Sequence, residues 1–332
     1  FHVMQGPMVS FCLNSLEDQE FYNRIEAEHY DLIIADVFPG SRCNLVLAYK
    51  LGVPIVSFSG SFEPWLLRLP AVPSFVTSSH FSPHTPEMSF WERLQNLYEL
   101  VSWSSDNGLN ELLSTGLVRK YVPEKPTISI DEIAQQSVLW FIDQDFAMDY
   151  ARPLMPHEAL VGGMTTVPPK PLPKDLEDFM SNFSYGVIVL SFGSTVSALP
   201  EFIISKIIDA LSPVSYGIIM RYPGEIPVDA PKHMKLMSWI PQNDLLGHPN
   251  TKLFITHCGN NGQYEALYSA VPSIGFPIFA EQEYNALRMQ YRGFGIKMDI
   301  MNFQSDELVK IIQKVITNPK YKKSIEKASA IY

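Results

Sequence analysis

The segment over residues 239–282 combines residue types that a structural core does not need. Its sequence, WIPQNDLLGHPNTKLFITHCGNNGQYEALYSAVPSIGFPIFAEQ, places a tryptophan, a histidine, adjacent asparagines and an acid–amide pair between apolar runs. Aromatic faces, amide groups and carboxylates bind polar ligands by stacking and by hydrogen bonds. The mixture predicts a pocket for a polar, negatively charged ligand.

Two glycine-containing turns follow predicted strands in this part of the chain. The first is GST, residues 193–195, after VIVLSF, and the second is HCGNNG, residues 257–262, which leads into a predicted helix. A helix N-terminus carries unpaired N–H groups and about half a unit of positive charge, and Gly and Asn let an anion approach closely. Two such turns facing one cleft predict a diphosphate site, although an Asn-rich turn before a helix is also an ordinary cap.

Two further side chains are consistent with a nucleotide. Glu265 lies on the inner turn of an apolar helix, where a buried charge needs a partner that ribose hydroxyls would supply. Trp239, at a strand end, offers a flat face for a base. Taken singly, a residue such as Trp239 or His257 is more often part of the core than of a ligand site, so the prediction depends on Trp239, His257 and Glu265 together.

Composition limits the class of partner. The chain has 332 residues and a net charge of −10, and it is long enough for about two domains. Clustered Lys and Arg are absent, so a small ligand is expected rather than nucleic acid. Cys12, Cys43 and Cys258 have no C-x-x-C spacing and predict neither a zinc ribbon nor a disulfide framework. The sequence also lacks a G-x-x-x-x-G-K-[ST] loop and an apolar run of the roughly 18 residues that span a bilayer.

The elements that must position these residues alternate between strands and helices. YDLIIADVF over residues 30–38 predicts a buried strand, because residues 32–35 are continuously apolar, and a helix ending at Gly52 leads to a strand over residues 53–60. Further strands are predicted over residues 185–194, 216–222, 234–239, 251–257 and 272–279. Helices are predicted over residues 201–211, 262–270, 281–293 and 305–317, the last with Ser305 as its cap. This alternation predicts an α/β fold with parallel sheets, whose ligand lies beyond the carboxyl ends of the strands.

A proline-rich stretch marks the boundary between two parts of the chain. Pro168, Pro169, Pro171 and Pro173 form a stiff, non-helical connection. We therefore predict one domain over residues 1–160, a linker over residues 161–174 and a second domain over residues 175–332.

The residues from WIPQNDLLGHP through ITHCGNNGQYEA to PIFAEQEYN resemble the signature of the UDP-glycosyltransferases, the animal family that includes the UDP-glucuronosyltransferases and UDP-glucosyltransferases. The similarity extends to VIVLSFGS, PPKPLPKDLEDFM and, more loosely, DLIIADVF, and it covers nearly the whole chain. It implies a GT-B fold, in which two Rossmann-like parallel-sheet domains face a cleft. Residues 1–160 would be an incomplete acceptor-binding domain, and residues 175–332 would bind the UDP-sugar.

The resemblance also implies roles for the matching residues. Trp239 would stack on uracil, Gln242 would lie beside the nucleoside, and Glu265 would bind the ribose hydroxyls. The turn residues would bind the remainder of the UDP-sugar around the diphosphate; these are Gly193, Ser194, His257, Gly259, Asn261 and Gly262. Glu281 and Gln282 would hydrogen-bond the sugar hydroxyls. Asp36 would be the catalytic acid that orients and charges a histidine base, with a helix cap as its alternative role.

The implied reaction is an inverting transfer of a hexosyl or glucuronosyl group from a UDP-sugar to a hydroxyl of a small lipophilic acceptor. A histidine would remove the hydroxyl proton and Asp36 would stabilise the imidazolium. The helix N-terminus, rather than a metal, would receive the charge of the departing UDP. No cofactor is implied beyond the donor substrate. Residues 61–100, rich in Pro, Phe, Trp and Leu, suit either an acceptor cleft or a membrane-facing patch.

The chain departs from the family pattern in several places. The family's catalytic histidine would precede Phe1 and the membrane-spanning tail is missing, so we expect a chain truncated at both ends that binds UDP-sugar without transferring it alone. Cys258 stands where a glycine is usual, and Glu281 stands where an aspartate is usual. The alternatives are a UDP-sugar-binding relative without transferase activity and, less favoured, a sugar-nucleotide epimerase.

The resemblance further implies an endoplasmic-reticulum membrane location, with lumenal catalytic domains, and a possible homo-oligomer. NFS at residues 182–184 is a glycosylation sequon, which agrees with a lumenal location.

Overall fold

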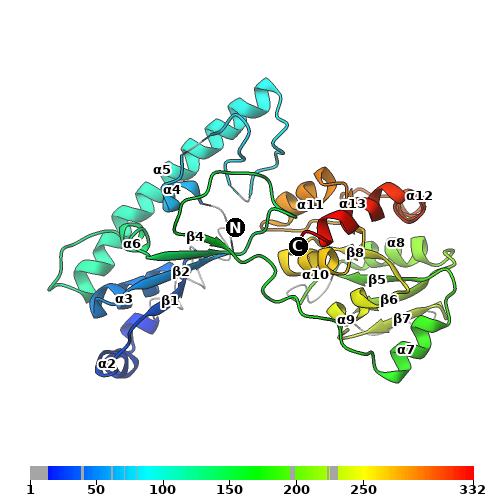
Figure 1. The fold of residues 1–332 in the computed structure, drawn as a ribbon, viewed down its shortest axis with the longest axis horizontal. Helices are drawn as coiled ribbons and strands as arrows, with labels where there is room; N and C mark the ends of the chain where they lie inside the picture. The colour runs from blue at the N-terminus through cyan, green and yellow to red at the C-terminus, as the bar shows by residue number, and fades with distance from the viewer. Residues whose placement is uncertain are drawn as a thin grey trace. The chain divides into compact units, whose positions relative to one another are not determined.

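The chain folds into two compact units (Figure 1). The computed structural model describes residues 14–332 except 39–40, 61–62, 71, 80, 195–198, 223 and 225–230, and it describes the backbone alone for residues 103–114. Unit 1 comprises residues 1–144 and Tyr150–Gly162, and unit 2 comprises Asp145–Asp149 and Gly163–Tyr332. The short segment Asp145–Asp149 therefore belongs to unit 2, although unit 1 supplies the chain on both sides of it.

Unit 1 is built on a parallel sheet of four strands in the order β1-β2-β3-β4. The strands are β1 Ile33–Asp36, β2 Ile55–Ser59, β3 Leu139–Ile142 and β4 Glu158–Leu160. The helices are α2 Gln19–Ala27, η1 Arg42–Asn44, α3 Leu45–Leu51, α4 Pro64–Leu67, α5 Phe90–Tyr121 and α6 Ile130–Ala134. The helix predicted to end at Gly52 is confirmed, since Gly52 caps α3 with a φ of +70°, a left-handed conformation that costs glycine little.

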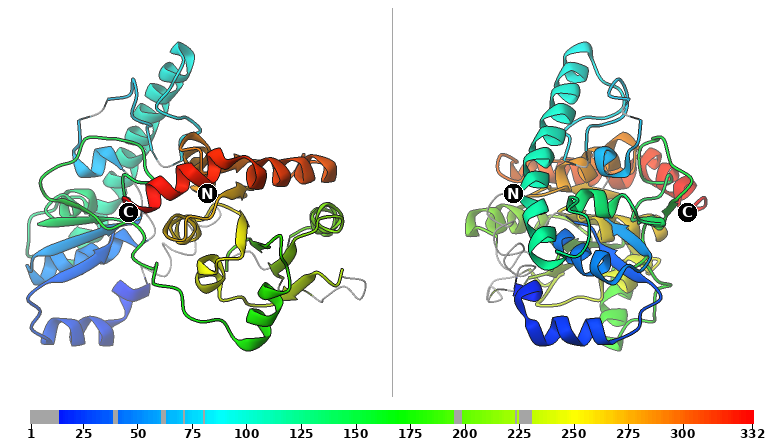
Figure 2. Two further views of the ribbon diagram at one scale, coloured as in Figure 1. Left: turned by 45° about the vertical axis from the view of Figure 1, so that its right-hand side comes forward. Right: turned by 90° about the vertical axis from the view of Figure 1, so that its left-hand side faces the viewer.

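The strand predicted over residues 30–38 is present as β1, but the prediction that residues 32–35 are buried is wrong within the described part of the chain. β1 lies at the edge of the sheet, and Ile34 is 65% exposed. An apolar run shows only that each residue favours burial. A strand is buried only where other elements pack on both faces of the sheet. Helix α5, which the sequence analysis did not predict, begins with a capping box between Ser89 and Glu92 and extends well beyond the strands (Figure 2).

Unit 2 is built on a parallel sheet of six strands in the order β10-β9-β8-β5-β6-β7. The strands are β5 Val187–Ser191, β6 Gly217–Arg221, β7 Met234–Met237, β8 Thr251–Thr256, β9 Ser273–Gly275 and β10 Gly295–Lys297. The helices are α7 Lys174–Ser181, α8 Glu201–Leu211, α9 Gln242–Gly247, α10 Asn260–Tyr268, α11 Gln282–Tyr291, α12 Ser305–Thr317 and α13 Pro319–Ser329.

The apolar run of β5 is explained by burial on both faces of this sheet. Ile188 and Leu190 join the core cluster formed with α8 and α12. Val187 and Val189 join the cluster formed with α7 and α9 on the opposite face (Figure 1). Alternate side chains of a strand point to opposite faces, so a strand covered by helices on both sides must be apolar at every position.

The strand order places β5 beside β8 at the point where the direction of the chain connections reverses. From β5 the chain proceeds outward to β6 and β7, and it then returns to the other side of β5 for β8, β9 and β10. Ser191 pairs with Thr256, so the two strands end at the same level. Such a reversal leaves a crevice outside the carboxyl ends of the two strands, which is where ligands bind in open α/β sheets.

Several predicted boundaries in unit 2 are wrong. Ser305 is the first residue of α12 rather than its cap, because Gln304 caps the helix in a reciprocal pair with Glu307. The Ser305 hydroxyl instead donates to the Lys206 carbonyl at 3.0 Å. Helix α10 begins two residues earlier than predicted, at Asn260, because its polar first turn shows no apolar periodicity.

The predicted strands over residues 234–239 and 272–279 are shorter in the structure, where β7 ends at Met237 and β9 at Gly275. The short strand β10 was not predicted. Apolar residues continue past each strand end, but the ladder stops where the neighbouring strand stops.

Cysteine chemistry differs between the two units. Cys43 in unit 1 is disulfide-bonded, whereas Cys258 in unit 2 is a free, fully buried thiol. Cysteine spacing gave no sign of the bond at Cys43, because spacing along the chain does not report proximity in space.

Candidate nucleotide-sugar site

The two glycine turns lie side by side in unit 2. The His257 ring, which follows β8, fits between Gly193, which follows β5, and Gly259. A Cβ atom built at either glycine would lie 2.6 Å from the His257 ring, a separation that real side chains do not tolerate. Gly193 also has a φ of +77°. Both positions therefore require glycine, and the histidine brings the two predicted turns into contact.

The environment of His257 keeps its imidazole neutral. Burial lowers the pKa of His257 to about 4, and a backbone hydrogen bond with Ser191 opposes this shift. At neutral pH the ring is therefore uncharged and carries a single N–H, which can donate either to the Ser191 backbone or to a ligand, but not to both. The positive potential at this place comes from the N-terminus of α10.

The first turn of α10 has no side-chain cap. Its N-cap residue is Gly259, which has no side chain to accept from the first N–H groups of the helix. Asn261 is exposed in this first turn, and Ser194 is exposed beyond β5. Thr195, the last residue of the first predicted turn, lies outside the described residues. Uncapped N–H groups beside exposed hydroxyl and amide side chains suit a diphosphate.

Cys258 occupies a left-handed backbone conformation, with a φ of +66°. Its N–H donates to the Thr256 hydroxyl at 3.2 Å, so that amide is already engaged within the protein. Burial raises the pKa of the Cys258 thiol to about 12, which keeps it protonated and unreactive. The substitution for the usual glycine therefore adds buried sulfur to the core and adds no nucleophile.

Of the three predicted nucleoside residues, the structure joins Gln242 and Glu265 directly, whereas the ring of Trp239 contacts Arg221. Trp239 lies two residues after β7 and is 65% exposed, so its face is accessible for stacking. Gln242 donates from Nε2 to Glu265 Oε2 at 2.6 Å. Burial raises the pKa of Glu265, and the bond from Gln242 opposes this rise. Gly262 permits the pairing, because a Cβ there would lie 3.2 Å from Gln242 Nε2. The sequence analysis expected ribose hydroxyls as the partner of the buried Glu265 carboxylate. In the structure the Gln242 amide is a partner as well, and it orients the carboxylate.

Glu281 and Gln282 lie at the start of α11 and not at a strand end. Glu281 is the N-cap residue, and burial raises its pKa. Gln282 is buried, and its Oε1 accepts from the backbone N–H groups of Ile278 and Phe279 at 2.9 and 3.1 Å. The Gln282 oxygen therefore shapes the loop before α11, and these two bonds do not involve its Nε2 group.

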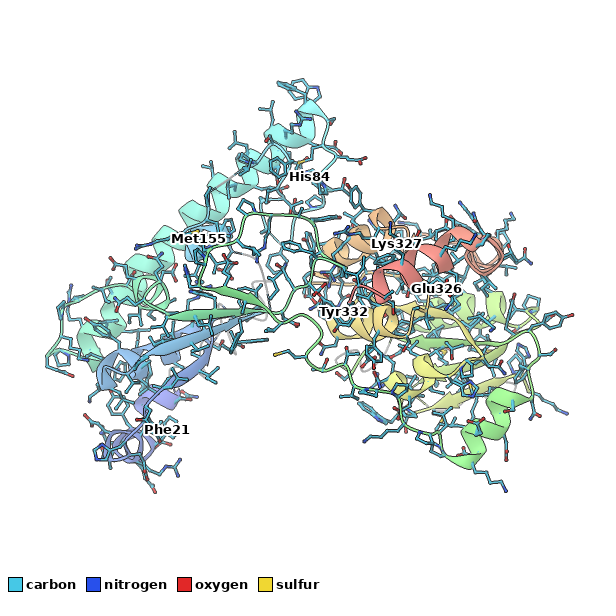
Figure 3. All side chains as sticks on the ribbon, in the orientation of Figure 1. Phe21, His84, Met155, Glu326, Lys327 and Tyr332 are labelled. Carbon is cyan, nitrogen blue, oxygen red and sulfur yellow. The ribbon has the colours of Figure 1, made fainter. Side chains whose placement is uncertain are left out.

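Asp36 belongs to unit 1, whereas the other predicted site residues belong to unit 2. It is the last residue of β1, and its Oδ1 accepts from the Phe38 N–H at 2.9 Å. It caps neither η1 nor α3, whose N-caps are Ser41 and Asn44, so the alternative role is not observed. Asp36 also lines a cavity of about 600 Å³ together with Phe21 of α2 (Figure 3), and its carboxylate is exposed.

The described part of the chain contains no cluster of three or more His, Cys, Asp or Glu side chains able to hold a metal ion.

Comparison with known proteins identifies the family. A family model described as UDP-glucoronosyl and UDP-glucosyl transferase matches residues 2–332. The chain belongs to this family. It is 31% identical over 332 residues to the UDP-glucuronosyltransferase 1A1 of Mus musculus, and 33% identical over 328 residues to the UDP-glucuronosyltransferase 2B7 of Homo sapiens. These alignments cover 98% and 97% of this chain and 61% of each relative, so the chain spans about 61% of the length of these relatives.

Solved structures confirm the fold class. The glycotransferase of kitacinnamycin superposes with a TM-score of 0.68 at 14% identity, over 99% of this chain and 78% of that one. The calicheamicin glycosyltransferase CalG4 gives a TM-score of 0.63 at 18% identity, over 98% and 77%. Both neighbours are GT-B glycosyltransferases, and the predicted GT-B architecture is therefore confirmed.

One residue of this family member's site was missed in the sequence. Arg221, the last residue of β6, donates from Nη1 to the Gly193 carbonyl, and its guanidinium lies 5.7 Å from the centre of the Trp239 ring. It thus links the first glycine turn to the exposed indole, by a hydrogen bond on one side and a cation–π contact on the other. Its position at the carboxyl end of a predicted strand, where ligands bind in parallel sheets, could have identified it as a candidate site residue.

The low pKa of His257 predicts a stability that depends on pH. Between its unfolded value of 6.5 and its folded value of about 4, the unfolded chain binds a proton that the folded chain does not. Stability present above pH 6.5 is therefore lost as the pH falls toward 4, by about 2 kcal/mol between about pH 7.5 and 5.0. Urea unfolding of the protein and of His257→Asn at both pH values measures this loss. A variant that loses as much stability as the parent would remove His257 as its source.

Proposed function

We propose that the protein transfers a glycosyl group from a UDP-sugar to a hydroxyl of a small lipophilic acceptor, with inversion at the anomeric carbon. The observation that carries this proposal is the meeting of two glycine turns around His257 at the β5/β8 reversal, beside the uncapped N-terminus of α10. A diphosphate is the ligand that this arrangement of donors suits best. Trp239 and the oriented Glu265 add the features that a uridine needs.

On the donor side, the residues of unit 2 bind the leaving group. The first N–H groups of α10 and the Ser194 hydroxyl donate to the diphosphate. The neutral His257 contacts it by turning its single N–H from the Ser191 backbone to a phosphate oxygen. The helix dipole stabilises the negative charge that grows as UDP departs. Glu265 accepts from the ribose hydroxyls. Glu281 and the Gln282 Nε2 group bind the sugar hydroxyls and fix the ring for attack.

On the acceptor side, a histidine base removes the hydroxyl proton as the oxygen attacks the anomeric carbon. Asp36 orients that histidine and stabilises the imidazolium. The UDP-sugar is the donor substrate, and no further cofactor is proposed. The attacking oxygen forms its bond as the bond to UDP breaks, so a single in-line displacement inverts the anomeric carbon.

Two measurements on the same preparation test the proposal. Calorimetry should detect UDP binding that is tighter than ADP binding, and the complete gene product should transfer sugar to a phenolic acceptor from UDP-glucose or UDP-glucuronic acid. Absence of UDP binding would overturn the nucleotide site itself. UDP binding without transfer by the complete gene product would favour the alternative, a UDP-sugar-binding relative.

We also propose that the protein works at the endoplasmic-reticulum membrane with its two units in the lumen. The disulfide at Cys43 supports an oxidising compartment. The described part of the chain has no helix that is both long and apolar enough to cross a bilayer. Helix α5 exposes Phe90, Trp91 and Tyr98, side chains of the kind that settle at a membrane surface.

The lumenal location predicts N-glycosylation of Asn182. This residue is exposed at the C-terminal end of α7, and the sequon NFS begins at it. Expression through a secretory pathway should yield a protein whose mass falls on amidase treatment, and Asn182→Gln should abolish that change. If the parent and the variant have equal mass before treatment, Asn182 carries no glycan.

A further inference from the structure

A buried ion pair joins the segment Asp145–Asp149 to α11. Arg288 is 1% exposed and Asp149 is 2% exposed, and the guanidinium Nη1 of Arg288 contacts Asp149 Oδ1. Tyr264 of α10 donates to the second oxygen, Asp149 Oδ2, at 2.7 Å. One turn after Arg288, the Nε of Arg292 donates to the Met148 carbonyl at 3.1 Å. The segment is thus fixed in unit 2 by two arginines of one helix.

Arg288 also reaches the first turn of α10. Its Nη2 donates to Asn260 Oδ1 at 3.0 Å and to Gln263 Oε1 at 2.9 Å. A guanidinium has donors and no acceptors, so both amide groups must turn their oxygens toward it. Arg288 therefore fixes the orientation of the Asn260 and Gln263 side-chain amides.

The chain of hydrogen bonds continues to the turn before α10. Gln263 donates from Nε2 to the Asn285 carbonyl at 2.9 Å, and Asn285 donates from Nδ2 to the Cys258 carbonyl at 3.0 Å. Arg288 therefore acts on both sides of Gly259, through Asn260 after it and through Cys258 before it. The two terminal nitrogens of Arg288 are thus engaged, Nη1 by Asp149 and Nη2 by Asn260 and Gln263, whereas its Nε has no partner among the described residues. Buried networks of such bonds restrict the geometry of their members.

The turn needs such an external restraint. Its N-cap is a glycine, which contributes no side-chain cap and has wide backbone freedom. Asn260 is the first residue of α10, and the neighbouring N–H groups are the ones assigned above to the diphosphate. A shift of this turn would move those donors away from the phosphate oxygens, and hydrogen bonds weaken steeply with misalignment.

We propose that Arg288 is a positioning residue for donor binding: through Asn260 and Gln263 it holds the first turn of α10 in the geometry that receives the diphosphate, and Asp149 holds Arg288 in place. This inference rests on the proposed UDP-sugar site. Arg288 itself does not touch the ligand. A lysine cannot replace it, because one ammonium group cannot serve Asp149, Asn260 and Gln263 in a planar arrangement.

UDP affinity measured by calorimetry tests the proposal with four variants of the protein. Asn260→Ala and Arg288→Lys should each weaken UDP binding about tenfold. The double variant should be no weaker than either single one, because both changes break the same restraint. Leu267→Ala is the matched control, because Leu267 is fully buried on the same helix and makes no hydrogen bond to Arg288 or Asp149. It should lower Tm and leave UDP affinity within about twofold.

The outcomes separate this inference from the proposed function. A parent protein that fails to bind UDP overturns both. A parent that binds UDP, with an Asn260→Ala variant of equal affinity, overturns the inference alone, and this partly exposed position decides the matter even if Arg288→Lys does not fold. Losses that multiply in the double variant, or a Leu267→Ala variant that binds UDP as weakly as Asn260→Ala, would assign Arg288 to general stability instead.

Discussion

Replacing Asp36 by asparagine is expected to lower the turnover of the complete gene product by about 10²–10⁴-fold while UDP affinity stays unchanged. Asparagine keeps the shape and an oxygen that can still accept from the Phe38 N–H, so the turn after β1 is preserved. It loses the negative charge that would stabilise an imidazolium. Asp36 belongs to unit 1, and the residues assigned to the nucleotide belong to unit 2.

The measurement is kcat with a phenolic acceptor, made beside UDP calorimetry. Asp31→Asn, a change at an exposed acid five residues earlier in the same unit, is the matched control and should behave as the parent does. Full turnover in Asp36→Asn would assign the role to another residue. A loss of UDP affinity along with turnover would mean that the variant disturbs more than proton transfer.

Replacing Glu265 by alanine is expected to weaken UDP binding by roughly 1–3 kcal/mol, about 5- to 150-fold. Its Oε2 accepts from Gln242, which holds the carboxylate in one orientation. Its pKa is raised by burial, so the carboxylate gains from a hydrogen-bonding ligand that replaces lost water. The ribose hydroxyls are that ligand in the proposed site.

Comparison of UDP with 2′-deoxy-UDP makes this prediction specific. The parent should bind UDP more tightly than 2′-deoxy-UDP. Glu265→Ala should bind the two nucleotides equally, because it lacks the carboxylate that accepts from the ribose 2′-hydroxyl. Glu201→Ala, at an exposed position on α8, provides a surface control. If Glu265→Ala weakens both nucleotides by the same factor, Glu265 supports the site without contacting ribose.

Local patterns were sufficient for the order of elements in unit 2. Apolar runs bounded by turn residues identified β5, β6 and β8, and apolar periodicity identified α8 and α12. The glycine turns after β5 and β8 stood out because chemistry in parallel sheets follows strand ends. Predicted element boundaries were wrong where a neighbouring strand, and not the local sequence, ends the element. In β9, for example, the strand pairing ends at Gly275 although apolar residues continue beyond it.

By itself, then, the sequence determined the α/β class, the family and the residue types at the site, because these depend on neighbours along the chain. Only the tertiary structure decided that β5 lies beside β8, that the His257 ring sits between two glycines, and that Arg221 joins Gly193 to Trp239. Arg288 is the clearest case, since in the sequence it is one more basic residue on a helix, and its partner Asp149 lies 139 positions earlier. Burial and ion pairing depend on which elements pack against each other, and the periodicity of residues along the chain does not show which elements do so.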